Sequence, residues 1–318
     1  MWLIKSDEET DERFGKRPED RTIDESIPLS VIIVDKHSGP TSSQITQWTK
    51  EILSIGKAGH TGTLDPAVTG VLPVALGDSV KAMPLLVGLK KEYVGVMHLH
   101  NEVDEATLKR TSLNFIGKIM QLVPKRAAVA RRVREREIFY FDIVEMDGRD
   151  VLFRAGVEAG TYIRKLVHDL GQSLGTGAHM SELRRTKVGK FEEKDSYSLV
   201  EIKDAYEFWK QGDGSQLKRM LIPIEHAISE SKKLFVKNSA VEAICNGSPV
   251  YPAGITRIQD DLIAGEDVGI FTQKEELIAI GIAKMDAEKM NKAKKGVAVR
   301  TDRVIMPKGI YPRGWKEG

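Results

Sequence analysis

The sequence predicts an α+β protein in which a mixed-sheet domain precedes a smaller, mostly β domain. The chain has 318 residues, of which 41% are apolar, so it can bury sizeable cores and wholesale disorder is excluded. Helix and strand patterns are interleaved up to Pro223, whereas short strands dominate from Leu234 onward. We therefore place residues 31–230 in the larger domain and residues 231–318 in the smaller one.

The first 30 residues differ in composition from the rest of the chain. They hold nine acidic residues against five basic ones. Charged segments of this kind are usually solvated. We predict that residues 1–30 form an acidic, partly ordered tail that stays outside the core.

Strand and helix patterns follow one another through the larger domain. Residues 30–34 are a short apolar run typical of a buried strand. Thr41 and Gln44 have capping-box spacing, which predicts a helix start directly after Pro40. The dipeptide Asp147-Gly148 is a hairpin turn signal. The further predicted strands are residues 70–76, 91–100, 138–144 and 151–157, and the further predicted helices are residues 162–174 and 199–210.

The smaller domain is predicted from short apolar segments around one helix. The helix begins at Ser239 and ends at Gly247, a residue that commonly follows the last helical turn. The predicted strands are residues 234–237, 268–272, 277–283 and 297–306.

Two stretches are strongly basic although the formal net charge of the chain is only +2. Residues 125–136 hold six basic residues against one acidic residue, and residues 284–316 hold ten against three. A basic stretch is often only a solvated surface. Two of them on separate domains favour a polyanionic partner, because each neutralised phosphate releases counterions. The candidate phosphate-binding side chains of the first stretch are Lys125, Arg126, Arg131, Arg132 and Arg134.

Several classes of protein are excluded by composition. A single cysteine, Cys245, rules out a disulfide framework and fits the reducing cytoplasm, where we expect the protein to be located. The longest nearly apolar run, residues 67–77, is shorter than the ~20 residues of a membrane span. The acidic N-terminus suggests no secretory signal. No glycine-rich phosphate loop or metal-ligand spacing is found, so we expect neither a nucleotide cofactor nor a metal.

The segment from residue 57 to residue 69 is predicted to be a loop and is the most informative one for chemistry. Pro66 keeps Asp65 out of helical backbone geometry, and Gly59 and Gly62 allow a bulky ligand to approach the backbone. A carboxylate on such a stiff turn can act as a nucleophile. An Asp-Pro pair alone, however, is most often only a turn.

Two further side chains bear on this loop. Arg164 lies at the start of a predicted helix and is either solvated or available to hold a carboxylate bidentately. Tyr93 lies on a predicted strand, where a tyrosine is usually part of the core but can also line a pocket.

Four motifs occur in a fixed order along the chain: HTGTLDP, KEY, GTYIR and GAHMSELRRT. Together they resemble the TruB/dyskerin family of pseudouridine synthases, and the C-terminal module resembles a PUA RNA-binding domain. The likeness runs from about Ile32 to Tyr311. It is greatest to the archaeal dyskerin branch of the family, whose members are catalytic subunits of H/ACA guide-RNA particles.

The resemblance implies that Asp65 is the catalytic aspartate, which attacks either the uracil ring or the sugar of a target uridine. Arg164 is similar to the arginine that pairs with that aspartate, and Tyr93 to the tyrosine that stacks on the base. By the same likeness, His60 assists in flipping the uridine out of the RNA, and Tyr162 and Leu183 line its pocket. The basic loop at residues 125–136 resembles the segment that closes over substrate RNA.

One segment departs from the family pattern. His37 follows Lys36 where many relatives have proline, so we expect only a structural role for this segment. The reaction that the resemblance implies is an isomerisation without cofactor or metal.

The implied partners are an H/ACA guide RNA, the substrate RNA and three small proteins: a zinc-ribbon-like or peptide-like protein, a β-barrel protein and a kink-turn-binding protein. Two alternatives stay open. One is a stand-alone transfer-RNA pseudouridine synthase, which would share the same site. The other is a non-catalytic RNA-binding scaffold, which would have no need of Asp65, Tyr93 and Arg164 together. The sequence does not identify the target uridines.

Overall fold

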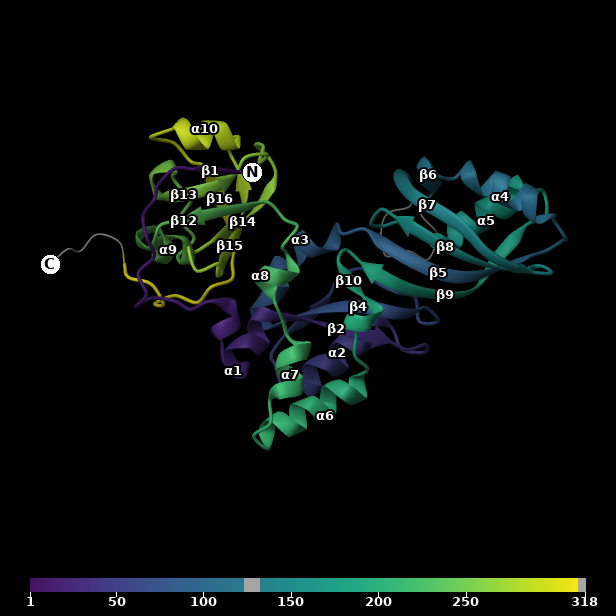
Figure 1. The fold of residues 1–318 in the computed structure, drawn as a ribbon, viewed down its shortest axis with the longest axis horizontal. Coiled ribbons are helices and arrows are strands. Elements are labelled where there is room, and N and C mark those ends of the chain that lie inside the picture. The colour runs from purple at the N-terminus through teal and green to yellow at the C-terminus, as the bar shows by residue number, and fades with distance from the viewer. Residues whose placement is uncertain (123–131, 314–318) are drawn as a thin grey trace.

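The computed structural model describes residues 1–122 and 132–313, which form two β-sheets with helices packed around them (Figure 1). The larger sheet has the strand order β11-β2-β4-β9-β5-β8-β7-β6, with β3 added beside β4 and β10 beside β9. The smaller sheet has the order β1-β13-β12-β14-β15-β16. Strands β4 and β9 run parallel, as do β12 and β14, and the other strand pairs among the described residues are antiparallel. The predicted α+β class with a mixed sheet is thereby confirmed.

The larger sheet and its helices occupy the chain from residue 23 to residue 227. The strands are β2 (Ser30–Lys36), β3 (Ala58–His60), β4 (Thr69–Leu76), β5 (Lys91–Leu99), β6 (Gly117–Leu122), β7 (Val133–Asp147), β8 (Asp150–Val157), β9 (Ala178–Val188), β10 (Phe191–Glu192) and β11 (Ile222–Pro223). The helices are α1 (Ile23–Ser26), α2 (Ser42–Ile52), α3 (Met83–Val87), α4 (Glu105–Leu113), α5 (Ile163–Ser173), α6 (Leu199–Lys210), α7 (Ser215–Met220) and α8 (Ile224–Ala227).

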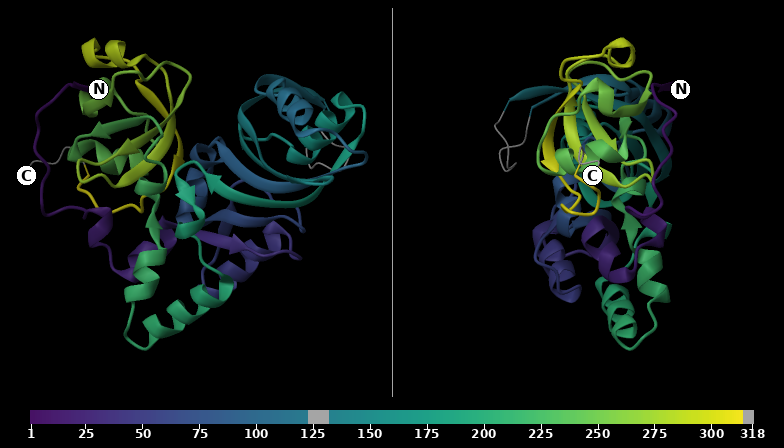
Figure 2. Two further views of the ribbon diagram at one scale, coloured as in Figure 1. Left: turned by 45° about the vertical axis from the view of Figure 1, so that its right-hand side comes forward. Right: turned by 90° about the vertical axis from the view of Figure 1, so that its left-hand side faces the viewer.

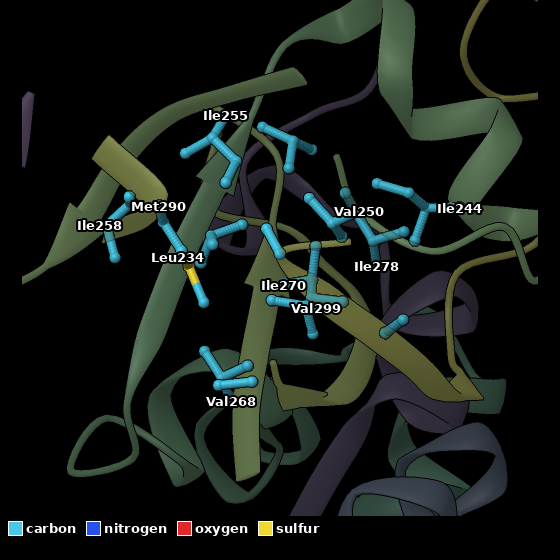
Figure 3. Packing of buried hydrophobic residues seen from close by; sticks show 14 of the residues in the cluster. Leu234, Ile244, Val250, Ile255, Ile258, Val268, Ile270, Ile278, Met290 and Val299 are labelled. Atoms are coloured by element: carbon cyan, nitrogen blue, oxygen red, sulfur yellow. The ribbon is translucent and has the colours of Figure 1, made fainter. Parts of the chain in front are cut away.

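The smaller sheet is built from the C-terminal part of the chain and from its first residues. Its strands are β1 (Trp2–Ile4), β12 (Lys233–Val236), β13 (Ile255–Gln259), β14 (Asp267–Phe271), β15 (Leu277–Ala283) and β16 (Val299–Val304), and its helices are α9 (Asn238–Cys245) and α10 (Ala287–Lys292). Branched aliphatic side chains from these strands and from α9 meet in one core (Figure 3). The change from one sheet to the other falls between Pro223 and Lys233.

The N-terminal segment is ordered and packs on the smaller sheet, which corrects the expectation that it stays apart from the core, although only Pro18, Arg21, Ile27 and Ser30 of its residues are buried. Residues 2–4 form β1, which pairs antiparallel with β13 of the smaller sheet. Further along, Arg21 is only 6% exposed and forms a bidentate ion pair with Glu225, with N–O distances of 2.8 and 3.0 Å. Figure 2 shows the segment running along the smaller sheet toward α1. Its many acidic residues concealed these contacts, because each depends on a partner more than 200 positions away.

Three clusters of buried side chains pack the helices onto the larger sheet and join the two sheets. Helices α4 and α5 cover one face of β5, β7 and β8, while α2 and α6 pack against β2 and β4. A third cluster joins the two sheets, because Val31 and Val71 of the larger one pack in the same core as Phe271 and Ile280 of the smaller one. The two sheets therefore share apolar surface.

Each predicted strand and helix corresponds to an observed one, although elements such as α4, β6, β13 and α10 were not predicted. The predicted capping box is present at the start of α2, because the side chain of Thr41 accepts from the N–H of Gln44. The predicted hairpin turn is also present, and Gly148 in it has φ of +57°. Strand β3 lies inside the segment predicted as a loop, because its three residues are ordered by pairing with β4. The sequence analysis also missed β9, whose charged residues give no strand pattern, although it lies between β4 and β5.

Candidate active site

The loop between β3 and β4 carries Asp65 on a turn anchored by buried neighbours. Leu64 and Val68 are each 3% exposed and pack in the same core cluster. The N–H of Val68 donates to the carbonyl of Asp65 over 3.0 Å, which closes a turn whose second residue, Pro66, has a fixed φ. The Asp65 side chain is 55% exposed. The turn therefore presents a carboxylate to solvent from a fixed backbone.

Two buried polar side chains hold this turn from below. The hydroxyl of Ser42 accepts from the N–H of Leu64 over 2.8 Å and donates to its carbonyl over 3.0 Å. The fully buried ammonium of Lys36 donates to the carbonyls of His37, Pro66 and Val68 over 2.8–3.0 Å. Burial lowers the pKa of Lys36, and the negative charge of Asp65 opposes that shift. Lys36 thus has a structural role, in agreement with the prediction.

Asp65 and Arg164, which are 99 positions apart in the chain, form an ion pair in the structure. Arg164 is the second residue of α5, and its Nη2 contacts Oδ2 of Asp65. The contact involves one nitrogen and one oxygen, instead of the bidentate pairing considered from the sequence. Both side chains are more than half exposed, so the pair lies at the surface where a ligand can reach it. A guanidinium in this position can hold the carboxylate in one orientation through a charged hydrogen bond.

The start of α5 is held by a residue that the sequence analysis missed. The side chain of Gln121, on β6, is 1% exposed. Its Oε1 accepts from the N–H of Tyr162 over 3.0 Å, and its Nε2 donates to the carbonyl of Tyr162 over 3.3 Å. Tyr162 directly precedes α5, so Gln121 fixes the backbone from which Arg164 extends. Nothing in the sequence pattern of residues 117–122 distinguishes Gln121 from a surface residue.

Tyr93 and Leu183 lie in the core cluster that supports the Asp65 turn. Tyr93 is 8% exposed and shares the cluster with Leu64 and Val68. Leu183, on β9, is partly buried against the same cluster and pairs with Gly95 of β5. An alanine at residue 95 would place its Cβ 2.8 Å from Leu183, so a glycine is needed for this close packing. The two side chains therefore pack in or against the cluster that contains Leu64 and Val68, the buried residues on either side of Asp65.

His60 ends β3, and its tautomer follows from its neighbours. The hydroxyl of Thr46 donates to the carbonyl of Ser42, so it accepts from Nδ1 of His60 across the 3.0 Å between them. Nε2 is then the acceptor nitrogen and lies 3.4 Å from the hydroxyl of Thr63. Burial and the positive charge of Arg185 lower the pKa of His60, which keeps the ring neutral at pH 7. Thr63 and Asp65 belong to the same loop, so His60 flanks the site.

Two buried cations below the loop were also missed. Arg185, on β9, is 1% exposed and donates to the carbonyls of Val71 and Gly62 over 2.8 and 3.0 Å. Lys91 is 6% exposed, and burial together with the charge of Arg185 lowers its pKa to about 8. Gly62 has φ of +77°, and a Cβ there would lie 3.3 Å from Nη1 of Arg185. Both cations occur within motifs quoted above. Lys91 and Tyr93 are two positions apart on one strand and so lie on the same face, an alternation that could have predicted that Lys91 is buried.

The predicted phosphate-binding residues are only partly described. Lys125, Arg126 and Arg131 lie outside the described residues. Arg132 is exposed, and Arg134 lies at the start of β7, opposite Gln121 of β6. Because Gln121 contacts Tyr162, the described end of the basic stretch adjoins the start of α5.

The site combines the carboxylate of Asp65 and the guanidinium of Arg164 with Tyr93 in the core cluster that holds the Asp65 turn. Such a set can supply a nucleophile and an aromatic surface for a flat ring. Within residues 1–122 and 132–313, no group of three or more His, Cys, Asp or Glu side chains is arranged to hold a metal ion. No helix in the described part of the chain is long and apolar enough to cross a membrane.

Four family models match the chain and together cover nearly all of it. They are the DKCLD (NUC011) domain over residues 1–46, the N-terminal domain of TruB family pseudouridylate synthase over residues 50–163, the tRNA pseudouridylate synthase B C-terminal domain over residues 164–229, and the PUA domain over residues 232–305. The Asp65–Arg164 pair thus joins two consecutive family domains.

Similar proteins cover the chain from end to end. Proteins named probable tRNA pseudouridine synthase B from Methanopyrus kandleri and Methanocaldococcus jannaschii are each 48% identical, over 98% and 99% of this chain and 93% and 94% of their own length. A Cbf5 chain from an archaeal box H/ACA Nop10–Cbf5 complex superposes with a TM-score of 0.92 at 42% identity, covering 99% of this chain and 98% of that one. A chain from a Cbf5–Nop10–Gar1 complex gives a TM-score of 0.94 at 44% identity, with 98% and 96% covered.

The fold and these matches define an RNA pseudouridine synthase with a C-terminal PUA domain. More closely, the chain belongs to the TruB/dyskerin family, and its structure matches archaeal Cbf5, the dyskerin of that lineage.

Proposed function

We propose that this protein is the catalytic subunit of an H/ACA ribonucleoprotein and converts uridine to pseudouridine in ribosomal RNA at positions chosen by a guide RNA. The observation that carries the proposal is the full-length likeness to the Cbf5 chains of H/ACA complexes, which includes the N-terminal segment packed on the smaller sheet. A related solved structure is an H/ACA particle bound to substrate RNA containing 2′-deoxyuridine. Proteins of the Nop10 and Gar1 kinds are the partners that these structures suggest.

A second candidate function is supported by the names of the curated relatives. Proteins 48% identical to this chain are named probable tRNA pseudouridine synthase B. A stand-alone enzyme acting on transfer RNA would use the same catalytic groups. The two functions therefore differ in how the uridine is chosen, and a guide RNA separates them experimentally.

The reaction breaks the bond between N1 of uracil and C1′ of ribose and forms a bond between C5 and C1′. The base gains a proton at N1 and loses one from C5, so the overall change is an isomerisation. In the proposed mechanism, the Asp65 carboxylate attacks the target uridine, at the ring or at the sugar, and Arg164 keeps that carboxylate oriented. Tyr93 and Leu183 form the floor under the uracil ring. Tyr162 lines the pocket, and His60 supports the flipped nucleotide.

The recognition of a long RNA sequence needs more base-reading groups than this site offers. Asp65, Arg164, His60 and two tyrosines are enough to recognise one base, so the choice of position must come from RNA shape or from pairing with a second RNA. Guide pairing would supply that choice, with the basic residues around Arg132 and Arg134 holding the RNA backbone.

The test is a uridine isomerisation assay on a ribosomal RNA fragment, with and without a matching guide RNA and proteins of the Nop10, Gar1 and kink-turn-binding kinds. We expect little activity from the chain alone and robust activity with guide and partners. A guide whose pairing segments are changed should move the modification to the newly matched uridine. Asp65→Asn should abolish the reaction, whereas Asp142→Asn, which alters another exposed, arginine-paired aspartate, should retain it.

Two results would contradict the proposal. If the chain alone modifies one uridine of transfer RNA efficiently and a changed guide neither redirects nor increases activity, the stand-alone function is the better account. If Asp65→Asn retains activity within tenfold of the wild type, Asp65 is not the nucleophile.

A further inference from the structure

A concavity lies beside the active-site loop and shares only His60 with the reaction derived above. It has a volume of about 370 Å³ and opens between α2, β3 and α3. Its walls include Thr46, Gln47 and Lys50 of α2, His60 of β3 and Met83 of α3. This volume is within the ~300–1,000 Å³ range of pockets that hold small ligands.

The chemistry of the walls fits a nucleobase attached to a phosphate. Met83 gives a polarisable apolar surface, and Gly59 lets it approach, because a Cβ at residue 59 would lie 2.6 Å from Sδ of Met83. Gln47 donates its amide to Glu51 over 2.7 Å, which leaves the carbonyl oxygen free to accept from a base. Lys50 lies in the pocket wall, where its ammonium can meet a phosphate. The pocket walls contain no carboxylate.

His60 connects this pocket to the catalytic loop. Its ring belongs to the pocket wall, its Nδ1 is bound to Thr46, and its acceptor Nε2 points to Thr63, two residues before Asp65. The imidazole of His60 therefore lines the pocket on one side and contacts the loop that bears Asp65 on the other. A strand of RNA whose uridine lies at Asp65 can place its neighbouring nucleotide on the other side of this ring.

We infer that this pocket, named here the α2–α3 pocket, binds the base of the nucleotide adjacent to the target uridine in the substrate RNA. The inference rests on the proposed function, because it requires an RNA substrate at Asp65. Bound in this way, the adjacent base is unstacked from the uridine, and part of the cost of flipping is offset by contacts with Met83 and His60. The pocket then contributes to substrate affinity rather than to the chemical step.

The test measures KM and the single-turnover rate at saturation for two substrates in whichever assembly supports isomerisation. One substrate has the natural nucleotide beside the target uridine, and the other has an abasic nucleotide there. For the wild type, we expect the abasic substrate to raise KM roughly tenfold and to change the saturated rate less than threefold. Met83→Trp, which fills the pocket, should raise KM similarly for the natural substrate and should show no further increase with the abasic one.

Two further variants complete the design. Lys50→Ala should weaken binding and lower the slope of log affinity against log salt by ~0.7, the value of one lost phosphate contact to a single strand. Leu113→Trp makes the same kind of aromatic substitution at a residue 61% exposed on α4 and should leave both kinetic constants unchanged.

The outcomes separate this inference from the proposed function. If the wild type isomerises uridine but the abasic substrate and Met83→Trp both have normal KM values, the pocket does not bind the adjacent base and the proposed function stands. If Met83→Trp weakens assembly with the partner proteins while KM for RNA is unchanged, the occupant is a protein and the inference is wrong. If no assembly of the wild type isomerises uridine, the proposed function itself fails.

Discussion

At the level of single residues, one side chain contacts the carboxylate of Asp65 and several others hold the backbone that carries it. Arg164 contacts one carboxylate oxygen, while Pro66, Ser42 and Lys36 act on the backbone of the turn. These two contributions can be separated by substitution, because Arg164 touches the carboxylate and the others do not.

Arg164→Ala should lower the rate of isomerisation at saturating substrate by ~100-fold, since a carboxylate that loses its partner is no longer held in the reactive orientation. Arg164→Lys should lose less, because the single contact in the structure needs one nitrogen rather than a fork. Single-turnover rates measure both effects. Normal turnover by the alanine variant would show that the ion pair is only a surface contact.

Lys91 predicts a dependence of stability on pH. Its pKa is about 8 in the folded protein and 10.5 in the absence of burial and of Arg185, so between these values the unfolded chain binds more protons and stability rises with pH. Below pH 8 the buried charge lowers stability by its full amount. The free energy of unfolding of Lys91→Met should therefore exceed that of the wild type by the largest amount below pH 8. This difference should shrink by about 3 kcal/mol by pH 10.5. Denaturant titrations across this range would contradict the assignment if the difference were constant.

At the level of elements, the catalytic loop is held by α2 and β2 rather than by its own sequence. The Ser42 hydroxyl pairs with both backbone groups of Leu64, and the neighbouring α2 residues line the pocket beside the loop. The start of α5 depends in the same way on β6, through Gln121. Each active-site group thus takes its position from an element elsewhere in the chain.

Ser42→Ala should lower the free energy of unfolding by about 1–3 kcal/mol, because it leaves the buried N–H and carbonyl of Leu64 unpaired. It should also reduce the saturated rate, since the turn bearing Asp65 loses an anchor. Ser112→Ala is the matched control: Ser112 is 2% exposed but binds only a carbonyl of its own helix, α4. A thermal melt and a single-turnover assay on each variant distinguish the two effects. Equal catalytic losses in both would show that Ser42 acts through general stability alone.

At the level of the whole molecule, three distant segments meet at Glu225. Its carboxylate accepts from Arg21 of the N-terminal segment and, over 3.0 Å, from the N–H of Leu277 on β15. The apolar cluster shared by both sheets surrounds this junction with Ile224 and Leu277. Deletion of residues 232–318 would expose that cluster. The contribution of the PUA domain to RNA binding is therefore better tested by substituting exposed residues such as Lys294 and Lys295.

Glu225→Gln should destabilise the protein by about 3–5 kcal/mol, because the guanidinium of Arg21 is left buried without its charge partner. The double variant Arg21→Met/Glu225→Met should recover much of this loss, since no unpaired charge remains. Asp142→Asn, in an exposed ion pair with Arg154, should change stability by less than about 1 kcal/mol. Denaturant unfolding measures all three. A loss in Glu225→Gln no larger than in Asp142→Asn would show that the junction is not a strong link between the segments.

The local features of this protein follow from its amino-acid sequence. Capping residues at Thr41, the turn at Gly148, the strongly apolar strand β15 and the stiff Asp65-Pro66 turn are set by interactions between near neighbours in the chain, so they could be predicted. The four motifs also located the candidate site, because they place its residue types in a recognisable order.

Only the tertiary structure decided how distant segments pair. The pairing of β1 with β13, the charged strand β9 within the larger sheet, the buried cations Lys91 and Arg185, and the single contact between Arg164 and Asp65 could not be derived from local pattern. One physical reason explains why these features could not be predicted. A polar or charged residue that looks solvated in sequence is buried once a partner far along the chain satisfies its hydrogen bonds, and that partner is known only when the chain is folded.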